Sequence, residues 1–87
     1  MKITVEISFY PLTSQYGIDI IEFIRSLRIH EDIQIRTNTM STQLSGEFDR
    51  VMPAVNQAMK AAWSSELKAA IVLKCFNEGL ELQWLNV

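Results

Sequence analysis

The chain has 87 residues, of which 48% are hydrophobic, so it is long enough for one small domain with a packed core and too short for two. Its net charge of −2 and its lack of a lysine or arginine cluster exclude the electrostatic signature of a nucleic-acid-binding protein. No apolar run approaches the ~18 residues that span a membrane. We expect a single domain over residues 1–87 that begins without a secretory signal. Because the one cysteine cannot close an internal disulfide, we also expect a cytoplasmic protein.

The N-terminal third of the sequence predicts a strand followed by a helix. Residues 1–10 alternate between apolar and polar side chains, which is typical of a strand with one apolar face. Pro11 ends this strand because proline lacks a backbone donor. Residues 18–28 place apolar side chains three and four positions apart, with charged side chains opposite, which predicts an amphipathic helix.

A hairpin rich in polar side chains is predicted next. Residues 33–40 and 41–45 alternate, which indicates two strands joined by a turn near residues 38–41. The stretch TNTMSTQLSG at residues 37–46 contains seven uncharged polar residues, and strand propensity explains its threonines but not its asparagine and serines. A buried hydroxyl without a partner costs about 1–3 kcal/mol, so we expect these groups to meet one another, water or a ligand. Hydroxyls and amides suit a neutral, hydrogen-bonding heterocycle better than a phosphate or a carboxylate.

A second helix is predicted after the hairpin. Glu47 and Asp49 place negative charge at its start, where the helix dipole favours it, and apolar residues follow at helical spacing. Pro53 lies several residues past this start, so either the helix begins near Arg50 or its first turn is irregular.

The final segments complete the predicted fold. Residues 69–76 predict a strand that is apolar on nearly both faces, which suits an interior or covered position, and residues 80–85 are a candidate for a short extra strand. The order β-α-β-β-α-β is the ferredoxin-like split βαβ pattern. We therefore predict an α+β, ferredoxin-like βαββαβ sandwich, with a four-stranded antiparallel sheet in the order 4-1-3-2 and both helices on one face.

This fold gives the sheet a core face and an open face. The core face is expected to carry Ile3, Val5, Ile7, Phe9, Ile33, Ile35, Leu44, Ile71 and Leu73. The open face is expected to carry Thr4, Glu6, Ser8, Tyr10, Gln34, Arg36, Asn38, Gln43, Val72, Lys74 and Phe76. Because the open face mixes apolar and charged side chains, it suggests a partner, and we predict a homodimer or a dimer of dimers with sheet faces or edges in contact.

The reactive residues predict no catalytic or metal site. His30 is the only histidine and is expected to be solvated, Cys75 is expected in the core, and Glu6 is expected to pair with Lys74 or Arg36 across strands. One histidine and one cysteine are too few for a soft-ligand metal site, and no CxxC, HExxH or phosphate-binding glycine loop is present. We therefore predict a protein that is not an enzyme and that uses neither metal nor cofactor.

Two short motifs resemble a known family. SFYPL at residues 8–12 and TNTMSTQLSGEFDRVMPAV at residues 37–55 are similar to the YkoF-like thiamine/hydroxymethylpyrimidine-binding family, and the element order matches over nearly the whole chain. The resemblance implies a ferredoxin-like fold, no catalysis, and binding of thiamine or its pyrimidine precursor. Tandem members of that family pair two such domains in one chain, so two copies of this chain must associate to reproduce the arrangement.

The predicted ligand-binding residues lie at the end of the first strand and in the polar hairpin. They are Ser8, Tyr10, Asn38, Thr39, Ser41 and Thr42, with Glu6 and Thr37 as additional positions. Ser41, Thr42 and Asn38 offer donors and acceptors to an aminopyrimidine, and the Tyr10 ring suits its flat face. Glu6 is the carboxylate expected to favour the thiazolium cation of thiamine.

Strict alternation does not place all these residues together. It puts Ser8 and Asn38 on the open face and Thr42 on the core face, so a bulge or the strand ends must reconcile them. Two functions remain in view: a non-catalytic protein that binds thiamine or hydroxymethylpyrimidine in a homo-oligomer, and a ligand-free assembly module that uses the open sheet face.

Overall fold

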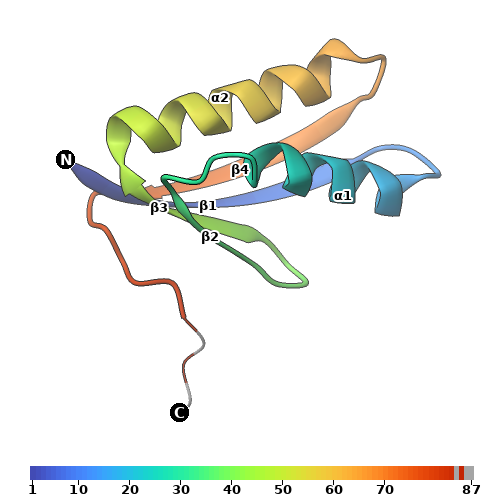
Figure 1. Ribbon diagram of the computed structural model, residues 1–87. Helices are drawn as coiled ribbons and strands as arrows, with labels where there is room; N and C mark the ends of the chain where they lie inside the picture. Colours follow the sequence, from blue (N-terminus) through green and yellow to red (C-terminus); the bar gives the residue numbers. More distant parts are fainter. Residues whose placement is uncertain (84, 86–87) are drawn as a thin grey trace.

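The strands form one antiparallel sheet, and both helices cover the same face of it (Figure 1). The structure is a computed structural model that describes residues 1–83 and 85. Its elements are β1 (Lys2–Pro11), α1 (Tyr16–Leu27), β2 (Gln34–Thr37), β3 (Thr42–Glu47), α2 (Phe48–Ser64) and β4 (Ala69–Phe76). The strand order is β2-β3-β1-β4, and every neighbouring pair is antiparallel. The predicted α+β ferredoxin-like fold is therefore confirmed.

The register of the strands divides the side chains between the two faces. Val5 lies opposite Leu44, and Leu44 lies opposite Ile35, so these three share the face that the helices cover. Glu6 follows Val5 and lies opposite Lys74, so both belong to the open face. All residues predicted for the core face are buried or pack against the buried core.

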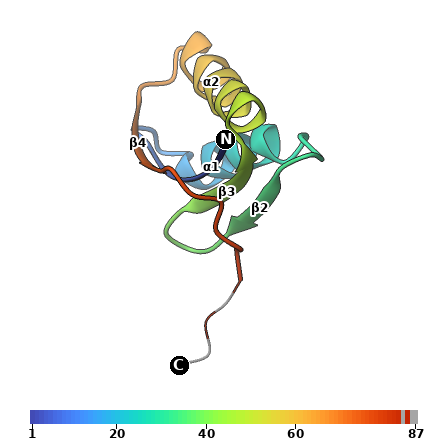
Figure 2. The ribbon, with the colours of Figure 1, turned by 90° about the vertical axis from the view of Figure 1, so that its left-hand side faces the viewer.

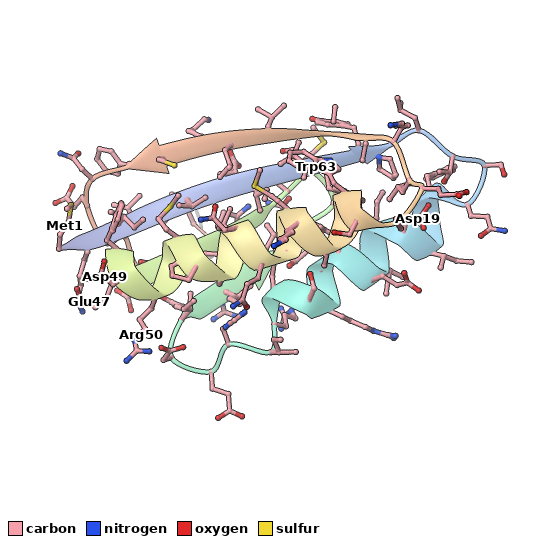
Figure 3. The ribbon with its side chains drawn as sticks, turned by 90° about the horizontal axis from the view of Figure 1, so that it is seen from above. Met1, Asp19, Glu47, Asp49, Arg50 and Trp63 are labelled. Carbon is pink, nitrogen blue, oxygen red and sulfur yellow. The ribbon has the colours of Figure 1, made fainter. Side chains whose placement is uncertain are left out.

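The helices contribute apolar stripes to this core. The buried residues of α2 recur every three or four positions, and α1 adds two more: Val51, Ala54, Val55, Ala58, Phe23 and Leu27. Phe9 of β1 stacks on Phe23 of α1 with ring centroids 4.3 Å apart, which fixes α1 against that part of the sheet. Seen from above, Met1 and Glu47 lie at one end of the molecule and Trp63 lies towards the other (Figure 3). Within residues 1–83 and 85, no helix is long and apolar enough to cross a membrane.

The helix α2 begins at Phe48 and not near Arg50, and it continues through Pro53. Proline lacks a backbone donor, so the carbonyl of Asp49 loses its usual helical partner. The full burial of Val51 and Val55, on either side of Pro53, offsets this local cost, since burying a valine side chain contributes about 1.5–3 kcal/mol.

The end of β4 departs from the sequence-based expectations. Cys75 is exposed, although it lies opposite the buried Val5. The cause is the position of β4 at the edge of the sheet, where a residue can share the core face and still reach solvent. The prediction of a buried cysteine is therefore wrong, and β4 is not an interior strand.

The segment after β4 crosses the open face of the sheet, on the side opposite the helices (Figure 2). The Thr4 hydroxyl donates to the carbonyl oxygen of Glu78 and accepts from the backbone N–H of Leu80, both at 2.8 Å. Arg36 of β2 donates its Nε–H to the carbonyl oxygen of Leu82, whose side chain is buried. Residues 80–83 and 85 form no strand, so the predicted extra strand is wrong there, and position 84 lies outside the described residues.

Candidate functional site

A cavity of about 210 Å³ lies between α1 and the end of the β2–β3 hairpin. We call it the hairpin cavity. The residues lining it are Ile7, Phe9, Tyr10, Ile20, Phe23, Ile24, Thr37, Asn38, Thr39, Met40, Ser41 and Thr42. Strand β1 and α1 supply an almost wholly apolar wall, and the hairpin supplies a mostly polar one. Pockets for drug-sized ligands measure ~300–1,000 Å³, so this cavity suits a single ring or one end of a longer molecule.

Six of the eight predicted site residues line the hairpin cavity. They are Tyr10, Thr37, Asn38, Thr39, Ser41 and Thr42. The structure does not bring Ser8 or Glu6 to it: both lie on the open face of β1, farther from the end of the strand than Tyr10. The Ser8 hydroxyl instead makes a long contact of 3.5 Å with the carbonyl oxygen of Met40. Strict alternation does not apply to Asn38 and Ser41, because they lie in the turn between the end of β2 and the start of β3, and Tyr10 lies one residue before the end of β1.

Asn38 organises the turn of the hairpin. Its side-chain oxygen accepts hydrogen bonds from the backbone N–H groups of Met40, at 2.8 Å, and Ser41, at 2.9 Å. Its own backbone N–H donates to the carbonyl oxygen of Ser41 at 3.0 Å. This is the self-bonded turn for which asparagine is favoured. The side-chain oxygen is therefore used by the fold, and the amide NH₂ is the part of Asn38 that can serve a ligand.

Thr37 and Thr42 form a cross-strand hydroxyl pair on the helix side of the sheet. Their oxygens lie 3.1 Å apart, and Thr42 is only 3% exposed. The pair needs one of its two hydroxyl hydrogens for this contact. One donor and several lone pairs therefore remain for a molecule in the hairpin cavity.

Glu6 is engaged on the open face. Its carboxylate accepts a hydrogen bond from the Ser41 hydroxyl at 2.8 Å and forms an ion pair with Lys74 at 3.3 Å. Gln43 completes the group by donating to the Ser41 oxygen at 2.7 Å. The hydrogen bond from Ser41, followed by that from Lys74 and its positive charge, lowers the pKa of Glu6 and outweighs the opposing effect of burial. The expected pair with Lys74 is present, and this carboxylate points away from the hairpin cavity.

Sequence reasoning missed the apolar wall of the hairpin cavity. Ile20, Phe23 and Ile24 belong to the apolar stripe of α1, which the helical spacing predicts. That spacing gives no indication of which part of the stripe is left partly uncovered, because this depends on how α1 sits against the hairpin. Among residues 1–83 and 85, no group of three or more His, Cys, Asp or Glu is placed to hold a metal ion.

The fold and this site define a ferredoxin-like α+β domain with a small amphipathic cavity between α1 and the β2–β3 hairpin. No family model matches the sequence, and no curated protein matches it significantly. A structure from Thermotoga maritima, provisionally named a thiamine biosynthesis/salvage protein, superposes with a TM-score of 0.78 at 17% identity, over 94% of this chain and 91% of that one.

Two further structures have the same fold. A hypothetical protein from Methanocaldococcus jannascii gives a TM-score of 0.76 at 20% identity, over 93% of this chain and 84% of that one. A domain of unknown function from Bacillus cereus gives 0.65 at 19% identity, over 91% and 78% of the respective chains. At these identities the likeness establishes the shared fold.

Proposed function

We propose that this protein is a non-catalytic, cytoplasmic small-molecule-binding protein whose hairpin cavity takes thiamine or its hydroxymethylpyrimidine moiety. The observation that carries the proposal is the pairing of an apolar wall with a wall of hydroxyl and amide groups in one cavity of about 210 Å³. A flat, neutral ring with both donors and acceptors matches such a cavity. The resemblance of the two motifs and the provisional name of the Thermotoga maritima neighbour support the same ligand class.

The hydrogen-bonding groups of the cavity match an aminopyrimidine. The Asn38 amide can donate to a ring nitrogen, and the oxygens of the Thr37–Thr42 pair can accept from the exocyclic amine. Tyr10, half exposed at the cavity, can cover the outer face of the ring. No carboxylate is among the described lining residues. We therefore place the pyrimidine inside and the cationic thiazolium of thiamine outside, in solvent.

A thermal-unfolding screen tests the proposal. Thiamine and hydroxymethylpyrimidine should each raise the unfolding temperature, because a ligand at 100 times its dissociation constant adds about 2.7 kcal/mol. The isolated thiazole alcohol is the matched control and should have little effect. Both pyrimidine compounds, and thiamine phosphates, should be recovered unchanged after long incubation. Stabilisation by the thiazole alone, or turnover that is lost on substituting a cavity residue, would contradict the proposal.

The alternative function is an assembly module without a ligand. The exposed apolar side chains of β4 support it. Val72 is 56% exposed and Phe76 46% exposed on the open face, and Tyr10 lies on the same face of the neighbouring strand. We propose a homodimer or a dimer of dimers through this surface, with or without a ligand in the cavity. A complete lack of response in the thermal screen, together with stable association, would favour the assembly module.

A further inference from the structure

A second cavity, of about 180 Å³, lies at the β2 edge of the sheet. We call it the arginine cavity. Its lining residues are Arg28, Arg36, Thr37, Asn38, Gln43 and Gln83. Two arginines and three residues with side-chain amides therefore line one small volume, and no acidic residue is among the described lining residues. The whole chain carries a net charge of −2, so this concentration of positive charge is local.

The surrounding contacts leave both guanidinium groups available. Arg36 uses its Nε–H for the carbonyl oxygen of Leu82 at 3.1 Å, which orients the side chain and leaves its terminal NH₂ groups free to donate to a ligand. Arg28 follows the last turn of α1 and reaches the cavity from the helix layer. The ion pairs among residues 1–83 and 85 all involve other residues, so no carboxylate there neutralises either arginine.

We infer that the arginine cavity binds the oxyanion of a small molecule, either a carboxylate or a phosphate group. A guanidinium group offers parallel N–H donors that match two oxygens of such an anion, and Asn38 and Gln43 can add neutral hydrogen bonds. The volume suits the charged group of a metabolite rather than a whole cofactor. Thr37 and Asn38 line both cavities, so an anion here would lie beside the hairpin cavity. The inference stands whether or not the hairpin cavity binds thiamine.

The test is an NMR titration of the full chain with inorganic phosphate, repeated with acetate, at constant ionic strength. We expect saturable shifts of the Asn38 and Gln43 side-chain amides in the millimolar range with at least one anion, and the stronger binder identifies the class. Arg28→Gln should weaken this binding about tenfold, because a charge-assisted hydrogen bond is lost. The matched control is Arg25→Gln, which removes the same charge from an exposed α1 residue outside the cavity and should change affinity less than twofold.

Three outcomes would overturn the inference: no saturable shift with either anion, equal weakening by Arg28→Gln and Arg25→Gln, or full affinity in Arg28→Gln. The first would show that the cavity takes no oxyanion, and the second would show general charge attraction only. If Arg28→Gln proves unstable, Arg28→Lys replaces it. That variant keeps the charge but loses the planar fork, so it should bind the anion more weakly than wild type, and full affinity in Arg28→Lys would then overturn the inference.

Discussion

Most polar side chains of the hairpin already have hydrogen-bond partners within the protein. Asn38 holds the turn, Thr37 pairs with Thr42, and Ser41 bonds to Glu6. These contacts explain why asparagine and serine occur in a segment where strand propensity alone disfavours them. A substitution in this stretch can therefore change stability, ligand binding or both. The two effects must be measured separately for each residue.

Asn38→Ala should lower the free energy of unfolding by about 1–2 kcal/mol, because two turn hydrogen bonds with a net value of ~0.5–1.5 kcal/mol each are lost. Urea unfolding measures this change. Thr39→Ala, at an exposed position of the same turn, is the control and should stay close to wild type. An unaltered midpoint for Asn38→Ala would show that its side chain does not hold the turn.

Glu6 makes stability depend on pH. Its pKa is lowered in the folded state, so its contribution is fully present above the ordinary value of 4.5 and is lost as the pH falls through the folded-state pKa. Glu6→Gln should therefore destabilise the protein at pH 7 and lose that effect under strongly acidic conditions. Unfolding curves for both proteins at pH 7 and pH 3 measure the difference. A stability gap of the same size at both pH values would count against a charged role for Glu6.

At the scale of elements, the two sequence periods account for most of the fold. Alternation in residues 1–10 and helical spacing in residues 18–28 predict the type of each element and the side chains on its core face, and the strand order follows from the βαββαβ pattern. The exposure of Cys75 and the path of residues 78–83 could not be predicted this way. The exposure of Cys75 depends on the position of β4 at the edge of the sheet. The path of residues 78–83 depends on individual contacts, such as the hydrogen bond from Thr4 to Glu78, which leave no periodic pattern in the sequence. The apolar wall of the hairpin cavity could not be predicted either, because it depends on how α1 packs against the hairpin.

Thr4→Val should release the segment that crosses the open face. Valine keeps the packing of this buried position but loses the hydrogen bonds to Glu78 and Leu80, at an expected cost of about 1–2 kcal/mol. Hydrogen exchange at the Leu80 amide should become faster in the variant. Thr39→Val, at an exposed threonine, serves as the control, and equal protection of Leu80 in all three proteins would refute the anchoring role of Thr4.

In the molecule as a whole, the C-terminal segment covers the open face over Thr4 and Ser45 and leaves the side chains of the edge strand β4 exposed. Thr4 and Ser45 beneath it are buried, whereas Tyr10, Val72 and Phe76 remain exposed. Small domains bury a limited fraction of their surface, so association through this uncovered region would add stability. The assembly proposal therefore concerns a defined part of the open face.

Val72→Glu should shift the protein towards monomer, because it places a charge in the exposed apolar region of β4. Sedimentation velocity at tens of micromolar, where weak dimers associate, measures the change. Ile18→Glu puts the same charge on an exposed site of α1 and should leave the oligomer intact. A wild-type protein that sediments as a monomer would contradict the assembly proposal.

Binding of an aminopyrimidine in the hairpin cavity can be measured by calorimetric titration of hydroxymethylpyrimidine into wild type, Thr42→Val and Ser8→Ala. Thr42 lines the cavity, and Ser8 is a hydroxyl on the same sheet that does not. We expect wild type and Ser8→Ala to bind alike, and Thr42→Val to lose about 1–3 kcal/mol of binding free energy while remaining folded. No binding to wild type, or equal affinity of Thr42→Val and wild type, would show that the hairpin cavity is not an aminopyrimidine site.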